Sequence, residues 1–152
     1  MNRIEWNDSL KIGMEEIDNQ HHELVVIYNE LCDAIESRAG AEQTMRILRH
    51  LGHYTSVHFA TEEALMRMLE YPEYEPHKRA HDALIEELRK LTHMAADLPQ
   101  GVNFQLMHMI KQWLSQHILE TDVKLVPHFV ARGIAPTFKK KGWFSKFNLF
   151  GG

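Results

Sequence analysis

The sequence predicts an all-α protein, an up-down-up-down antiparallel four-helix bundle with a short C-terminal helix and tail. Three observations support this fold class. Four long segments carry apolar residues at spacings of three and four, which place them on one face of a helix. The breaks between the segments are short and contain glycine or proline. The chain has no Asn-Gly or Asp-Gly hairpin signal and no sustained polar–apolar alternation, so strands are not expected.

The order of the predicted helices follows from these breaks. The long segments span residues 17–38, 42–69, 75–96 and 102–121, and a short one spans 122–132. Gly40 is suited to end the first helix, because glycine readily adopts the left-handed conformation needed just after a helix. The later breaks are marked by Pro72 and Pro76, by Pro99 and Gly101, and by Gly133 and Pro136.

The composition indicates one globular domain. The 152 residues are 44% hydrophobic and 25% charged, and we expect residues 1–132 to form the bundle and 133–152 a tail. No stretch approaches the ~20 apolar residues of a spanning helix, and the charged N-terminal residues do not resemble a secretory signal. We therefore expect a cytoplasmic protein, and a monomer. The single cysteine, Cys32, excludes an internal disulfide and a thiolate metal cluster.

Charge is distributed unevenly between body and tail. Residues 1–136 contain 13 basic and 21 acidic residues, which argues against nucleic-acid binding. The remaining residues contain four lysines, no acidic residue, and aromatic residues at 143, 144, 147 and 150. Such a basic amphipathic segment could bind a membrane surface or a partner protein. The alternatives are that it is disordered or folds onto the bundle.

Six polar residues occupy inward positions of the four helices at one level of the predicted bundle. They are His21, His58, Glu62, His77, His81 and His117. In an up-down bundle the starts of the first and third helices and the ends of the second and fourth share one end, so the six converge there. Burying so many unpartnered polar groups would be costly. The pattern therefore indicates a shared metal site.

Asp122 is a weaker candidate on spacing alone. It follows His117 by five residues and leaves the face of a regular helix, unless the helix tightens or widens at its last turn. The remaining histidines, at 22, 50, 53, 93, 108 and 128, are expected on the surface. Five imidazoles with two carboxylates exceed the needs of one ion, and two irons fit best. Donor type alone leaves zinc, copper and nickel open.

At these residues the chain resembles the hemerythrins, most closely the single-domain hemerythrins of bacteria. The matching elements are Trp6, IDNQH (17–21), HFATEE (58–63) with Met66, HKRAH (77–81) and WLSQHILETD (113–122). They cover about residues 4–125 and fill all seven ligand positions of the family in order. The family usually has another residue where this chain has His22. His21 is interpreted as the ligand because it shares the inward row of Ile17 and Tyr28.

The resemblance implies a non-haem di-iron centre. One iron would be held by His77, His81 and His117, and the other by His21 and His58, with one position open. Glu62 and Asp122 would bridge the two irons, together with an oxo or hydroxo group. The resemblance thus strengthens the assignment of Asp122.

The function that the resemblance implies is reversible dioxygen binding, for carriage, storage, delivery or sensing. The alternatives are a di-iron enzyme that consumes peroxide or nitric oxide, and an iron reservoir. The chain contains no Glu-x-x-His, the motif of di-iron carboxylate bundles, which argues against an oxygenase. Six residues within a helical turn of the expected ligands are candidate walls of a dry oxygen pocket: Leu24, Phe59, Leu84, Trp113, Leu114 and Ile118.

Overall fold

The computed structural model describes residues 3–99 and 101–137, and in these ranges every regular element is helical. A short 3-10 turn, η1 (Asp8–Leu10), precedes the bundle. The long helices are α1 (Glu15–Glu36), α2 (Ala41–Met68), α3 (Tyr74–Ala96) and α4 (Phe104–Gln116). Beyond α4 the chain continues through a π-helical turn, η2 (His117–Thr121), a 3-10 turn, η3 (Asp122–Lys124), and α5 (Leu125–Ala131). The predicted all-α fold class is confirmed.

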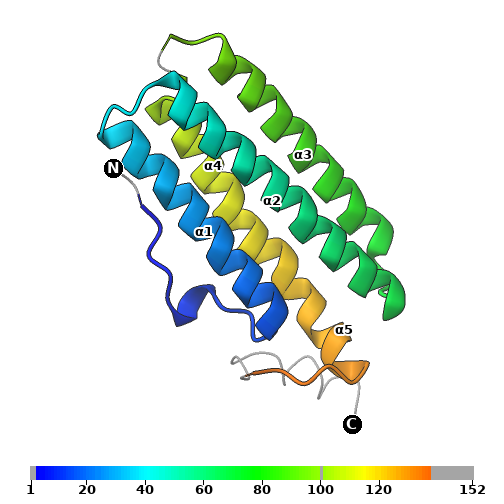
Figure 1. Ribbon diagram of the computed structural model, residues 1–152. Coiled ribbons are helices and arrows are strands. Elements are labelled where there is room, and N and C mark those ends of the chain that lie inside the picture. Colours follow the sequence, from blue (N-terminus) through cyan, green and yellow to red (C-terminus); the bar gives the residue numbers. More distant parts are fainter. Residues whose placement is uncertain (1–2, 100, 138–152) are drawn as a thin grey trace.

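The four long helices lie side by side, and successive helices run in opposite directions (Figure 1). α2 packs against both α1 and α3, and α5 extends α4 at the end of the bundle where α1 begins (Figure 1). The N-terminal stretch runs along the outside of the bundle before it enters α1 (Figure 1). This arrangement brings the start of α1, the end of α2 and the start of α3 to the same end, as the expected topology requires.

The apolar core consists of two clusters rather than one. The larger contains buried residues of all four long helices, such as Leu24, Leu51 and Leu114. The smaller joins the start of α1 to α5 and includes Ile17, Met66, Leu125, Val126 and Phe129. Along α2, the buried polar residues Thr55, His58 and Glu62 lie between Leu51 of the larger cluster and Met66 of the smaller one.

Gly101 fixes how the α3–α4 connection sits on α2. Its φ is +74°, and an added Cβ would lie 2.6 Å from Thr44 Oγ1 and 3.0 Å from Ala41 Cα. Both the left-handed backbone and the close approach to α2 therefore demand glycine at this position. The connection is thus held against the first turn of α2, where α4 begins.

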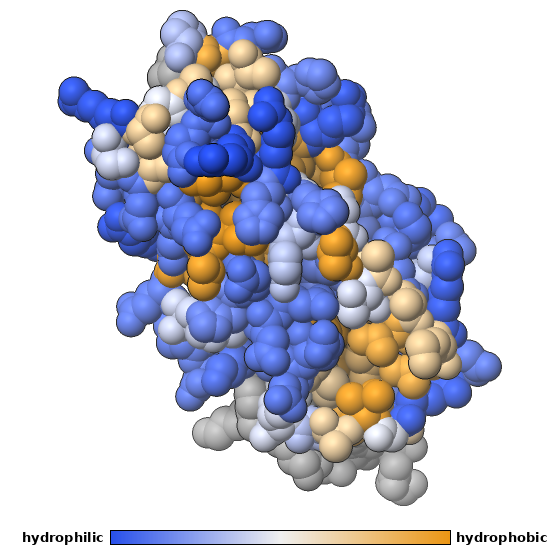
Figure 2. Space-filling model, in the orientation of Figure 1, coloured by the Kyte–Doolittle hydropathy of each residue, from blue (hydrophilic) through white to orange (hydrophobic). Residues whose placement is uncertain are grey.

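The surface in view is largely hydrophilic, with separate hydrophobic patches, the broadest towards the α5 end (Figure 2). Over residues 3–99 and 101–137 we find no helix with the length and apolar character needed to cross a membrane. The predicted amphipathic tail segment, with its aromatic residues at 143, 144, 147 and 150, lies outside the described residues.

Candidate metal centre

Seven titratable side chains meet at one level of the bundle, and each is at most 7% exposed. They are His21 from α1, His58 and Glu62 from α2, His77 and His81 from α3, and His117 and Asp122 from the segment after α4. The structure therefore brings together all six residues that lie on the inward helix faces. It also brings in Asp122, the residue whose spacing did not fit a regular helix.

Asp122 reaches the site because the helix widens at its last turn. The backbone N–H of Asp122 donates a hydrogen bond to the carbonyl oxygen of His117, five residues earlier, which defines a π turn. The wider turn absorbs one extra residue, so both side chains project inward. Asp122 Oδ2 lies 2.8 Å from His117 Nε2 and 2.7 Å from His21 Nε2. The sequence allowed for either a tighter or a wider turn, and the structure has the wider one.

The potential ligand atoms form two groups, within each of which all atoms lie less than 4.8 Å apart. One group contains His21, His58, Glu62, His117 and Asp122, and the other contains Glu62, His77, His81 and Asp122. Both carboxylates belong to both groups, which is the position a bridging ligand takes. Five imidazoles and two shared carboxylates thus offer donors for two ions.

The structure groups His117 with a different set of ligands from the set that the resemblance implies. Its ligand atom groups with those of His21 and His58, not with those of His77 and His81. Its ring lies between the two sets, however, because its centroid is 5.5 Å from that of His81 and 5.6 Å from that of His58. The His117 ring is therefore about equally near to both sets of imidazoles.

The donor set has the properties of a cation site. Within residues 3–99 and 101–137, several buried polar atoms lie close to ionic partners or to one another but form no hydrogen bond of acceptable geometry: Nε2 of His77, His81 and His117, both carboxylate oxygens of Glu62, and Asp122 Oδ1. Leaving such an atom unsatisfied costs about 1–3 kcal/mol, and native proteins seldom bury several together. All of these atoms are metal-ligating types, and they point to a common centre. A bound cation would satisfy them at once.

Electrostatics within the cluster oppose the effect of burial. Burial lowers the pKa of His58 and of His117, but the carboxylates of Glu62 and Asp122 outweigh it and raise these values to about 9 and about 10. Burial and the neighbouring Asp122 would raise the pKa of Glu62, but His58 and His117 lower it to about 2. The same carboxylates raise the pKa of His77 against the effect of burial. Without a metal, protons on these imidazoles therefore balance the two buried carboxylates.

His81 behaves in the opposite way. Burial lowers the pKa of His81 to about 3, assisted by the charges of His77 and His117, so this ring is neutral at pH 7. Its Nδ1–H donates to Glu63 Oε1 at 3.1 Å, which leaves the lone pair of Nε2 facing the cluster. The tautomer that a metal requires is therefore already set by a residue outside the ligand set.

Two residues that support the imidazoles were not identified as functional from the sequence. Glu63 accepts the hydrogen bond from His81, and Gln20 Oε1 accepts one from His58 Nδ1 at 2.6 Å. Ligating histidines commonly donate their second N–H to such acceptors. The available signal was proximity, since Gln20 precedes His21 and Glu63 follows Glu62. Proximity does not show which imidazole a neighbour will reach across the bundle.

The six candidate pocket walls divide by burial. Leu24, Phe59, Leu114 and Ile118 are buried, and the Phe59 ring stacks on His81 at a centroid distance of 3.8 Å. Trp113 stacks on His117 at 6.2 Å and is half-buried, as is Leu84. Leu84 and Trp113 line a separate cavity of about 260 Å³ between α3 and α4. Leu84 and Trp113 therefore lie at the side of the bundle next to the metal centre, and not inside the centre.

The histidines predicted to lie on the surface do so with one exception. The exposed ones are His22, His50, His53, His93 and His108. The prediction was wrong for His128, which is half-buried, with Nε2 2.6 Å from the carbonyl oxygen of Leu69. This ring links α5 to the end of α2, a contact between elements that helix periodicity does not register.

Comparison with known proteins points to one family. The family described as "Hemerythrin HHE cation binding domain" matches residues 12–129. A bacteriohemerythrin of Pseudomonas aeruginosa strain UCBPP-PA14 is 30% identical over 149 residues, covering 96% of this chain and 95% of the relative. Myohemerythrin-1 of Phascolopsis gouldii is 35% identical over 120 residues, covering 78% of this chain and 88% of the relative.

Solved structures show the same fold. A crystal structure titled as wild-type hemerythrin superposes with a TM-score of 0.73 at 24% sequence identity. The alignment covers 84% of this chain and 98% of that chain. The bundle described above is therefore the fold of these structures.

Proposed function

Since the chain belongs to the hemerythrin family, we propose that it binds dioxygen reversibly at a non-haem di-iron centre built from the seven buried side chains. Relatives in two groups of organisms bear names that denote hemerythrins. The proposal extends that family role to the cluster at the α1 start of this bundle.

The seven residues have distinct roles in this proposal. Glu62 and Asp122, which both groups share, would bridge the two ions. His77 and His81 serve one ion and His21 and His58 the other, with His117 positioned to complete either set. Two bound iron ions, with an oxo or hydroxo group between them, would supply the two electrons needed to hold dioxygen reversibly.

The observation that carries the proposal is the neutral, nitrogen-rich donor set. Five imidazoles face only two carboxylates, and all seven side chains are buried. A set with few anionic donors gives little stabilisation to high oxidation states of iron, which favours reversible binding over oxidation chemistry. The buried phenyl ring of Phe59 and the apolar side chains of Leu114 and Ile118 help to exclude water from this level.

Protons must leave the cluster when metal enters. His58 and His117 have raised pKa values because of the carboxylates, and both must be deprotonated to act as ligands. Glu63 and Gln20 then hold the outward N–H groups of His81 and His58, which fixes each ring with a lone pair towards the centre.

The test is optical. Iron-loaded protein is reduced without oxygen, exposed to oxygen, and then returned to an oxygen-free atmosphere while the charge-transfer absorbance is followed. Repeated appearance and loss of the bands is the expected result. Rapid oxidation without recovery would contradict reversible binding. It would favour a peroxide- or nitric-oxide-consuming enzyme, or an iron reservoir.

A variant ties the optical change to the cluster. His77→Ala removes a ligand of one group and is expected to abolish two-iron loading and the reversible bands. His108→Ala is the matched control, because His108 is exposed on α4. Two irons retained in His77→Ala, by metal analysis, would remove His77 from the ligand set.

A further inference from the structure

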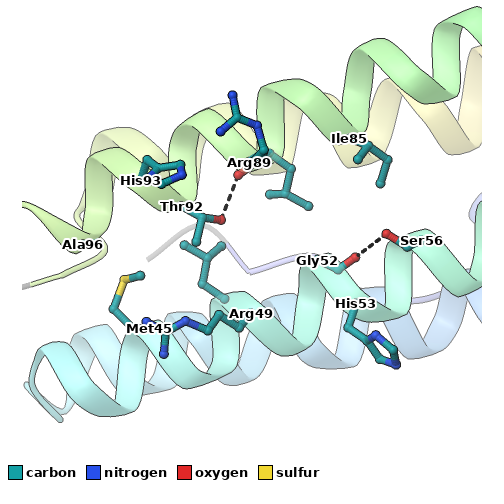
Figure 3. Close-up of a pocket in the computed structure, with 12 residues that line it drawn as sticks. Met45, Arg49, Gly52, His53, Ser56, Ile85, Arg89, Thr92, His93 and Ala96 are labelled. Carbon is teal, nitrogen blue, oxygen red and sulfur yellow. Dashed lines mark hydrogen bonds between the residues drawn. The ribbon is translucent and has the colours of Figure 1, made fainter.

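A second site candidate lies between α2 and α3, separate from the metal centre. A cavity of about 410 Å³ opens here towards solvent, beginning at Ser56 and extending along α2 to Met45, away from His58 (Figure 3). This volume is within the range of pockets that hold small molecules.

The floor of this groove is apolar and offers few polar contacts. Met45 from α2 and Ile85 from α3 both project into the space between the helices (Figure 3), and the buried side chains of Leu48 and Leu88 also line it. Two hydroxyls line it as well, but each donates to its own helix, Ser56 to the Gly52 carbonyl and Thr92 to the Leu88 carbonyl. An occupant of the floor would therefore meet mainly hydrocarbon.

Small residues among those that line the groove, Gly52, Ser56 and Ala96, leave room in it. Gly52 on α2 is the clearest case, since an added Cβ would have one neighbour, Leu88 Cδ2, at an ordinary contact distance of 3.7 Å. A glycine inside a helix is unfavourable relative to alanine. Neither packing nor a left-handed backbone demands glycine here, in contrast to Gly101. Its presence keeps the groove free of side-chain volume.

The charge of the groove is opposite to that of the body. Its charged lining residues are Arg49 and Arg89, and no carboxylate lines it, although residues 1–136 have eight more acidic than basic residues. Arg89 is paired with Glu86 at 2.7 Å, and its guanidinium points away from α2 (Figure 3). Arg49 forms no ion pair with any residue in 3–99 or 101–137, and its side chain extends along α2 towards Met45 (Figure 3).

We propose that this groove binds an aliphatic carboxylate, with the hydrocarbon chain against Met45 and Leu88 and the carboxylate on Arg49. An apolar floor selects a hydrocarbon chain, and a guanidinium without an acidic partner selects an anion with planar, two-oxygen geometry. A single such guanidinium matches a single negative charge. The site is independent of the metal ligands, none of which lines the groove.

The test is calorimetric titration of the full-length, iron-loaded protein with decanoate. We expect saturable one-to-one binding. Acetate lacks the chain and loses the apolar contact with the floor, and decyltrimethylammonium reverses the head charge and loses the charge-assisted hydrogen bond to Arg49. Each should therefore bind at least about tenfold more weakly. Absence of saturable decanoate binding would overturn the proposal, and equal binding of the cation would overturn the role of Arg49.

Two variants locate the bound molecule. Arg49→Gln should weaken decanoate binding about tenfold, whereas Arg46→Gln, an exposed residue one turn earlier on α2, should leave it unchanged. Gly52→Leu places a side chain in the groove and should abolish binding, while iron content and helical circular dichroism report that the fold is kept. Decanoate affinity that is unchanged in both Arg49→Gln and Gly52→Leu would place binding elsewhere and refute the site.

Discussion

His117 Nε2 lies 2.8 Å from Asp122 Oδ2, although the two residues are five positions apart in one continuous helical segment. A regular α-helix would direct these side chains to different faces. The π turn at His117–Thr121 brings them together and lets Asp122 also contact His21 of α1. The local backbone geometry of the last turn is therefore part of the metal centre.

Asp122→Asn tests the importance of this carboxylate with little change in shape. Iron loading should be lost or reduced, because the amide cannot bridge two cations as an anion does. In the metal-free variant the pKa of His117 should fall, since burial lowers it and Asp122 is the strongest opposing influence. Metal analysis and NMR titration of the imidazole measure the two effects. Glu120→Gln is the control, as Glu120 is exposed in the same turn. Full iron loading of Asp122→Asn would exclude a bridging role.

Adjacent histidines provide a matched pair. His21 is fully buried in the cluster, whereas His22 is exposed and stacks on Trp6 at a centroid distance of 5.0 Å. His21→Ala should reduce the iron content per chain. His22→Ala should retain it and lose only the stacking contribution, about 0.5 kcal/mol in the free energy of unfolding. Iron analysis and urea denaturation distinguish the pair, and the opposite pattern would reassign the ligand to His22.

Glu63→Ala tests the support of His81 from outside the ligand set. The variant leaves the outward Nδ1–H of His81 without its acceptor, so the ring is no longer held in the ligating tautomer. Loss of such a partner typically weakens metal affinity about 10–100-fold. Competition with a chelator measures the change. Glu30→Ala, an exposed residue of α1, should show no effect, and equal affinities for the two variants would rule out this role of Glu63.

The stability of the metal-free protein should fall as the pH rises above neutrality. His58 and His117 have pKa values of about 9 and about 10 in the fold, above the ordinary value of 6.5. Their stabilising contribution is therefore complete below about pH 6.5 and is lost as the pH rises through 9 to 10. Urea denaturation at pH 7 and pH 10 measures the loss.

The iron-loaded protein serves as the comparison for this pH series. Its imidazoles are already deprotonated as ligands, so this particular loss should be absent. The same linkage predicts that iron loading at pH 7 releases protons from His58 and His117. Calorimetry in buffers of different ionisation enthalpy counts these protons, and loading without proton release would show that the rings are neutral beforehand.

The sequence by itself determined the helices and the level of the polar cluster. Side-chain direction in a regular helix follows from residue spacing alone, so His21, His58, Glu62, His77, His81 and His117 could be assigned inward without coordinates. Residue spacing left Asp122 a weak candidate, and the family resemblance added it to the expected ligands.

Only the tertiary structure decided how Asp122 arrives, which acceptors hold the imidazoles, and where α2 and α3 leave a groove. The same residues could form an α turn or a π turn, which differ in whether a backbone N–H donates to the carbonyl four or five residues earlier. Tertiary contacts, such as that of Asp122 with His21, favour the π turn here. Gln20 and Glu63 reach histidines on other helices, and His128 reaches Leu69, the residue that follows α2. Such contacts depend on the relative placement of packed helices, whereas periodicity describes each helix alone.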